Sequence, residues 1–343
     1  MKKIIFFLIT IFAILLFGNC DDQFLNNEYK GGDWLYLDNS GAIMPLWVRG
    51  NKLSNVFIVY LHGGPGGTSI DSAVSPAHKT LQNYYACVYY DQRGSGTAQG
   101  NPKKETFTVE HFVDDLRKII ILIRYKYNNP AIFLMGHSWG GGLGTLFLLD
   151  TDNQTFISGW IEVNGGHDLT DGMVLSHEWA VNKVSEKINK GENRNKWEKE
   201  LSWYNRTVPR FEWNYLERHT NNVEQLNGYF YDSSKAVGMA SNLFTSPIAS
   251  FYFLNNFNMV KNLDLKSFNC TPEMFKITIP SLILWGKHDG ILPVQLAHNA
   301  YNSLGTNVDD KYLYIFEYSA HSPYVEEPDI FVEKVRTFIE KYR

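Results

Sequence analysis

Three residues of the types used in nucleophilic catalysis each follow an apolar run of the sequence: Ser138, Asp289 and His321. A serine hydroxyl is a weak nucleophile until a histidine accepts its proton. A carboxylate beside that histidine orients the imidazole and stabilises its charged form. Side chains just beyond the carboxyl ends of neighbouring parallel strands can meet in one crevice, so we expect these residues to form a Ser-His-Asp triad.

Ser138 stands at the centre of the pentapeptide Gly-His-Ser-Trp-Gly at 136–140. The apolar run 131–135 precedes this pentapeptide and a small-residue stretch, 141–144, follows it. The pattern indicates a strand, a sharp turn and a helix, which together expose the serine oxygen at a helix N-terminus. The flanking glycines prevent collisions with the adjoining backbone. We therefore interpret Ser138 as the nucleophile.

A glycine-rich loop at 62–67, His-Gly-Gly-Pro-Gly-Gly, follows the apolar run 56–61. Acyl transfer forms an oxyanion that is best held by backbone N–H donors fixed in advance, and glycine lets the main chain approach the substrate. We expect the backbone N–H groups of Gly64 and Trp139 to form this oxyanion hole. A phosphate-binding loop is disfavoured because 66–69 lacks the lysine that such a loop carries before its hydroxyl residue.

Strands and helices alternate along the sequence that must hold these residues. Continuously apolar runs are typical of strands covered on both faces, and the alternation predicts a largely parallel sheet. The predicted strands are 34–37, 43–49, 56–61, 86–90, 131–135, 158–163, 279–286 and 312–318, with amphipathic helices at 109–127 and 330–342. Because the chain order Ser, Asp, His is that of α/β-hydrolases, we predict this fold, with a mostly parallel eight-stranded sheet and helices on both faces.

The alternation stops between about 166 and 270, where tryptophans are interspersed with Lys, Glu and Asn. This change of character predicts an inserted helical cap domain. The expected organisation is therefore a first core part at 22–165, a cap at 166–270 and a second core part at 271–343, after a signal at 1–20.

Three motifs resemble those of the proline iminopeptidase (prolyl aminopeptidase) family of α/β-hydrolases. They are His-Gly-Gly-Pro-Gly-Gly at 62–67, Asp-Gln-Arg-Gly-Ser-Gly at 91–96 and Gly-His-Ser-Trp-Gly-Gly at 136–141. Of the middle motif, Asp91 and Arg93 could contact substrate, but we favour a structural ion pair or loop brace. The resemblance covers the predicted core and is much weaker in the predicted cap.

The resemblance implies that Ser138 is the nucleophile, that Asp289 and His321 are the acid and the base, and that no cofactor is needed. It also implies an aminopeptidase that releases N-terminal residues from small peptides and holds their free amino group with cap carboxylates. Acidic residues of the predicted cap that are candidates for this contact include Glu198, Glu200 and Glu212, besides Glu178, Glu217 and Glu224.

Two alternatives stay open: a carboxylesterase acting on small acyl esters, and a catalytically silent surface-binding protein on the same fold. The net charge of −4 gives no reason to expect a nucleic-acid partner. The histidines include no His-Glu-x-x-His pair, so we expect no metal site. The expected partner is a small molecule or a short peptide.

The N-terminus predicts export from the cytoplasm. Lys2 and Lys3, the apolar run 4–17 and the segment before Cys20 match the charged, hydrophobic and cleavage regions of a bacterial-type signal. The position of Cys20 resembles a lipoprotein signal, in which this cysteine becomes lipidated and attaches the protein to a membrane. A plain cleaved signal peptide and an uncleaved anchor are the alternatives.

Overall fold

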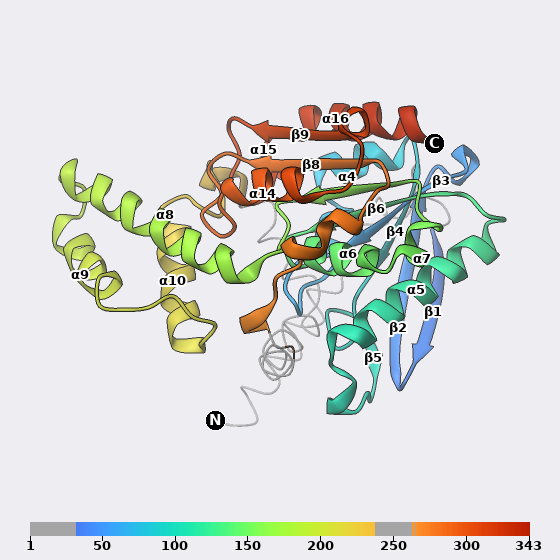
Figure 1. Ribbon diagram of the computed structural model, residues 1–343, viewed down its shortest axis with the longest axis horizontal. Helices are drawn as coiled ribbons and strands as arrows, with labels where there is room; N and C mark the ends of the chain where they lie inside the picture. The colour runs from blue at the N-terminus through green and yellow to red at the C-terminus, as the bar shows by residue number, and fades with distance from the viewer. Residues whose placement is uncertain (1–31, 237–262, 264) are drawn as a thin grey trace, which may run out of the picture.

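A mostly parallel β-sheet forms the centre of the fold (Figure 1). The computed structural model describes residues 32–236, 263 and 265–343. Within them the strands follow the order β1-β2-β4-β3-β6-β7-β8-β9, and β5 pairs with β2. The strands are β1 (Asp33–Asn39), β2 (Ala42–Gly50), β3 (Val56–Leu61), β4 (Ala86–Tyr90), β5 (Gln99–Gly100), β6 (Ala131–His137), β7 (Gly159–Val163), β8 (Ser281–Gly286) and β9 (Lys311–Phe316).

The prediction of an α/β-hydrolase fold is confirmed. The eight predicted strands form one continuous path, and the two-residue β5 adds a short strand at its side. Among the described strands, the antiparallel pairs are β1–β2, β2–β4 and β2–β5, and the other pairs are parallel. The α-helices of the described chain outside the predicted cap are α3 (Ile70–Ala73), α4 (Pro76–Gln82), α5 (Val109–Lys126), α6 (Trp139–Leu149), α7 (Thr151–Gln154), α14 (Gln295–Ser303), α15 (Pro323–Glu326) and α16 (Pro328–Tyr342).

Both faces of the sheet are buried, because alternate residues of its strands enter different apolar layers. In β3, Phe57, Val59 and Leu61 pack with α5, α6 and α14. The intervening residues Val56, Ile58 and Tyr60 pack on the opposite face with α4 and α16. This double coverage explains why the strand sequences are continuously apolar.

The parallel strands bring distant loops to one edge of the sheet. Leu61 at the end of β3 pairs with Gly136, and Val163 at the end of β7 pairs with both His137 and Leu284. The loops that follow β3, β6, β7, β8 and β9 therefore all begin at the carboxyl edge, where ligands bind in sheets of this kind.

In the described part of the segment between β7 and β8, the α-helices α8 (Leu169–Asn189), α9 (Arg194–Tyr204) and α10 (Trp213–Gln225) project to one side of the sheet (Figure 1). They have an apolar cluster of their own, which includes Val184, Trp197 and Val223. We call the segment between β7 and β8 the insertion. The exact boundaries of a cap domain stay a prediction.

The predicted signal and Cys20 lie in residues 1–31, outside the described part of the chain. Within the described part, no helix combines the length and the apolar character that crossing a membrane requires. Cys87 and Cys270 are buried free thiols, which agrees with the interpretation of Cys87 as a small apolar residue of a buried strand.

Candidate active site

Ser138 occupies the sharp turn between β6 and α6. Its backbone has φ 54° and ψ −124°, a conformation that residues other than glycine rarely adopt. The turn is tight because a Cβ added to Gly136 would lie 2.3 Å from the Gly140 carbonyl oxygen, and one added to Gly140 would lie 2.1 Å from that of Leu61. The close approach of backbone at Gly136 and Gly140, which lack side chains, thus holds the serine at the carboxyl edge.

His321 and Asp289 form a buried pair at the same edge. His321 Nδ1 lies 2.8 Å from Asp289 Oδ2, and the other carboxylate oxygen accepts from the N–H groups of Ile291 (2.8 Å) and Leu292 (3.0 Å). Because Nδ1 donates to the carboxylate, Nε2 is the ring nitrogen that can accept a proton. His137, which precedes the serine, is bonded through Nε2 to the His321 carbonyl oxygen at 2.8 Å. This bond ties the elbow to the histidine loop.

Asn164 is a residue of this site that the sequence analysis missed. It follows β7 directly, adopts a left-handed conformation (φ 43°), and donates from Nδ2 to Asp289 Oδ2 at 2.6 Å and to the Ala320 carbonyl at 3.2 Å. Its side chain therefore fixes the carboxylate and the loop of His321 together. The sequence did contain one hint of this role, namely an asparagine directly after a predicted strand, because asparagine tolerates the left-handed backbone conformation of such a turn.

The glycine-rich loop lies against the serine. A Cβ added to Gly63 would be 3.0 Å from the Cβ of Ser138, and Gly64 has φ 128°, which favours glycine. The Trp139 N–H is the first of α6, so no carbonyl of the helix can accept from it. Gly63, the neighbour of Gly64, thus lies beside the serine, and Trp139 follows it directly; the oxyanion hole of Gly64 and Trp139 stays a prediction.

Gln92 joins the glycine-rich loop to the elbow. Its Nε2 donates to the His62 carbonyl at 3.0 Å and its Oε1 accepts from Trp139 Nε1 at 2.9 Å. Its backbone N–H also donates to His62 Nε2 at 3.0 Å, so Nδ1 of that ring donates to the Gly63 carbonyl at 2.7 Å. Burial lowers the pKa of His62, which keeps the ring neutral in this arrangement.

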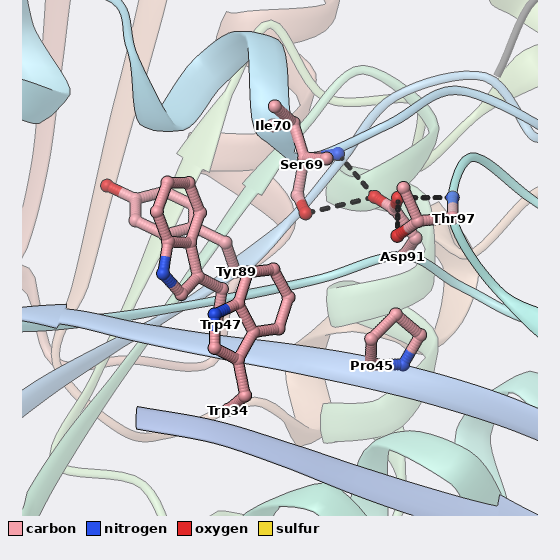
Figure 2. A pocket seen from close by; sticks show the side chains of 8 residues that line it. All are labelled: Trp34, Pro45, Trp47, Ser69, Ile70, Tyr89, Asp91 and Thr97. Carbon is pink, nitrogen blue, oxygen red and sulfur yellow. Dashed lines mark hydrogen bonds between the residues drawn. The ribbon is translucent and has the colours of Figure 1, made fainter. Parts of the chain in front are cut away.

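Asp91 and Arg93 brace loops, as favoured from the sequence. Figure 2 shows Asp91 accepting from Ser69 N (2.7 Å) and from Thr97 N (2.7 Å), beside a cavity of about 10 Å³ that could hold one water molecule at most. Arg93 forms a bidentate pair with Asp115, with both distances 2.6 Å. Neither residue is therefore left free to bind a substrate.

Three of the six glutamates selected from the sequence pair with arginines of the insertion. Glu198 contacts Arg194 at 2.8 Å, Glu200 contacts Arg218 at 2.9 Å, and Glu212 Oε2 lies 3.3 Å from Arg210 Nε. Glu178 and Glu217 are exposed. These carboxylates are engaged in ion pairs or surrounded by solvent.

Glu224 is exposed, like Glu178 and Glu217, whereas Asp71 is half-buried. Partial burial nevertheless raises the pKa of Glu224, and burial together with the charge of Asp91 raises the pKa of Asp71 to about 6. The pKa of Tyr229 is raised, mainly by burial. Charges of neighbouring groups, among them Glu224, Asp71 and Asp289, raise it further. The ring of Tyr229 lies 5.4 Å from that of His321. Two carboxylates with raised pKa values therefore lie around the residue that packs on the histidine.

The described residues contain no group of three or more His, Cys, Asp or Glu side chains placed to hold a metal ion. The chemistry that this arrangement supports is nucleophilic, with a serine at a strained turn, a histidine oriented by a carboxylate, and backbone donors beside the serine.

Comparisons with known proteins agree with this geometry. A family model described as alpha/beta hydrolase fold matches residues 56–328. A probable aminopeptidase, YbaC, of Bacillus subtilis (strain 168) is 28% identical over 305 residues, which cover 83% of this chain and 89% of the relative. A proline iminopeptidase of Saccharolobus solfataricus is 28% identical over 303 residues, 84% of this chain and 86% of the relative.

A solved structure of a proline iminopeptidase from Mycobacterium smegmatis has the same fold. It superposes with a TM-score of 0.66 at 17% identity, and covers 90% of this chain and 98% of its own.

Proposed function

Because this chain belongs to the alpha/beta hydrolase fold family, we propose that it is a serine aminopeptidase of the proline iminopeptidase type. The observation that carries the proposal is the Asp289–His321 pair, whose loop is hydrogen-bonded to the residue preceding Ser138. The relatives named as aminopeptidase and proline iminopeptidase support the choice of substrate class.

In the proposed reaction, Ser138 Oγ attacks the scissile carbonyl carbon while His321 Nε2 takes its proton. The N–H groups of Gly64 and Trp139 stabilise the negative charge on the carbonyl oxygen. Asp289 stabilises the imidazolium, which then gives its proton to the leaving amine as the C–N bond breaks. Water, activated by the same imidazole, hydrolyses the acyl-enzyme and restores Ser138.

We assign the capture of the substrate's free amino group to Glu224. Glu224 is exposed, but its charge acts on the Tyr229 that packs against His321, whereas Glu198, Glu200 and Glu212 pair with arginines. A charge-assisted hydrogen bond from an ammonium to such a carboxylate is worth about 1.5–3 kcal/mol, roughly a ten- to hundredfold preference over a blocked amine.

The test compares kcat/KM for a free aminoacyl arylamide, such as that of proline, with its N-acetylated form and with an acyl ester of similar size. We expect a clear preference for the free amine, which Glu224→Gln removes and the control Glu198→Gln keeps. Equal rates with free and acetylated amides, or turnover of the ester alone, would instead assign the same machinery to a carboxylesterase.

We also propose that the protein is exported and attached to a membrane through Cys20, on the basis of Lys2, Lys3 and the apolar run 4–17. Expressed in a bacterium, the wild type should fractionate with membranes, and Cys20→Ala should release it or block its maturation. Soluble cytoplasmic protein that retains Met1 would refute export.

A further inference from the structure

A short segment of the insertion is bonded to the loops that carry both the acid and the base. We call residues 228–232 the strap. The Gly228 carbonyl accepts from the N–H of Gly290, which follows Asp289, at 2.8 Å. The Tyr229 carbonyl accepts from the N–H of His321 itself at 3.0 Å. The insertion is therefore bonded to the backbone of His321 and to that of the residue after Asp289.

Glu326 joins the strap to the histidine loop a second time. Glu326 is only 2% exposed. Its Oε1 accepts from the N–H of Asp232 at 3.0 Å, and its Oε2 accepts from the N–H of Ala320 at 2.7 Å. One buried carboxylate thus fixes the end of the strap to the residue directly before His321.

Trp179 of α8 fills the space between the strap and the Asp289 loop. A Cβ added to Gly228 would lie 2.5 Å from its ring, and one added to Gly290 would lie 2.6 Å from the same six-membered ring. At the other end of the strap, Tyr231 stacks on His288 with ring centroids 4.5 Å apart. The position of the strap is therefore set by packing on both sides.

We propose that the strap is a positioning element, and that Glu326 is a positioning residue, which align His321 and Asp289 for proton transfer. The inference rests on the proposed function, because it assumes that these two residues are the base and the acid. Triad geometry tolerates shifts of only about 0.5 Å, and a displacement of about 1 Å costs on the order of a hundredfold in rate. Loss of a strap bond therefore reduces the rate of the chemical step.

Glu326→Gln tests the role of the carboxylate, because the amide keeps one acceptor oxygen but turns a donor toward the other N–H. We expect kcat and the rate of labelling by a fluorophosphonate probe to fall together by about ten- to a hundredfold, while KM changes little. Glu317→Gln is the matched control, since Glu317 is exposed and pairs with Lys287 close to the same loop. It should keep the wild-type labelling rate.

Gly290→Ala gives a second test that does not depend on Glu326. The new Cβ meets the Trp179 ring, so labelling should slow, and the smaller ring of Trp179→Phe in the double variant should restore part of the rate. Such rescue distinguishes displacement of the strap from general loss of folding.

Different results would overturn the proposed function and the role of the strap. Persistent labelling of Ser138→Ala would overturn the proposed function. Loss of labelling in Ser138→Ala, with wild-type labelling and kcat in both Glu326→Gln and Gly290→Ala, would overturn the role of the strap alone. A KM that rises at unchanged kcat in these variants would also overturn it, because the strap would then act on substrate binding.

Discussion

The sheet core and the insertion hold their polar residues in different ways. In the core, charged side chains such as Asp289–His321 and Arg93–Asp115 are buried and paired with one another. In the insertion, most ion pairs lie in solvent, for example Arg194–Glu198. The comparison teaches that the core holds its buried polar groups in fixed positions, whereas the ion pairs of the insertion are mostly solvated.

The largest expected difference between the two regions is the effect of a substitution on kcat. Ser138→Ala removes the proposed nucleophile and should lower kcat by a factor on the order of 10⁶, as loss of a triad member does in other serine hydrolases. Glu198→Ala, in the insertion, should leave kcat unchanged. The measurement is steady-state turnover of an arylamide, with circular dichroism as the check on folding. Similar losses in both variants would contradict the comparison.

Asp115→Ala tests the core through stability. It leaves the Arg93 guanidinium, which is fully buried, without its partner, and breaking a buried pair in this way costs about 3–5 kcal/mol. Urea unfolding should therefore show a large decrease in the free energy of unfolding. A decrease below about 1 kcal/mol would mean that water reaches the guanidinium in the folded state.

The buried histidines predict a loss of stability in acid. Burial lowers the pKa of His78 and His137 in the core, and of His219 in the insertion, to about 3 in each case. Each unfolded histidine binds a proton at about pH 6.5, so the unfolded state is favoured as the pH falls below that value.

The contribution of one histidine is about 1.4 kcal/mol per pH unit, or about 2 kcal/mol between pH 6.5 and pH 5. Carboxyl groups with raised pKa values, such as Glu326, make the folded state more stable as the pH falls, which opposes the effect of the histidines. Because these carboxyl groups are present in both the wild type and His78→Phe, the difference between the two proteins isolates the contribution of His78. Urea unfolding between pH 7 and pH 5 should give a shallower pH dependence for the variant. Parallel curves would show that His78 is protonated in the folded state.

The smallest expected effect is that of Glu198→Ala on stability. The pair with Arg194 joins residues four apart on the exposed face of α9, and such pairs contribute about 0.3–0.5 kcal/mol. The free energy of unfolding should change by no more than this, and the difference should vanish at high salt. A loss of several kcal/mol would place this pair in the same class as Arg93–Asp115.

The sequence was sufficient to predict the sheet and the residues at its carboxyl edge. Runs such as 56–61 and 131–135 are apolar throughout because both faces of their strands are covered, and the residues after them must lie at one edge. Among the strands that the structure describes, only the two-residue β5 was missed, since its residues are exposed and too few to show a period.

The polar residues that complete the site were not predictable in this way. Asn164, Gln92 and Glu326 contact partners that are far away in the sequence or lie on other loops, and their own surroundings show no pattern. In the insertion, helical periodicity indicates which side is buried but not which side faces the crevice. The role of Glu224 therefore depends on how α10 is rotated, which only the fold determines.

The adjacency of β7 and β8 in the sheet makes the insertion exchangeable. Val163 pairs directly with Leu284, so the chain leaves and re-enters the sheet between neighbouring strands. A segment of another length or composition can be grafted there without altering any strand pairing, which offers a route to new substrate ranges. The strap is part of what would be exchanged, however. A graft that retains residues 228–232 and the ring of Trp179 would keep a working triad, whereas one that replaces them would have to rebuild the acceptors for Gly290 and His321.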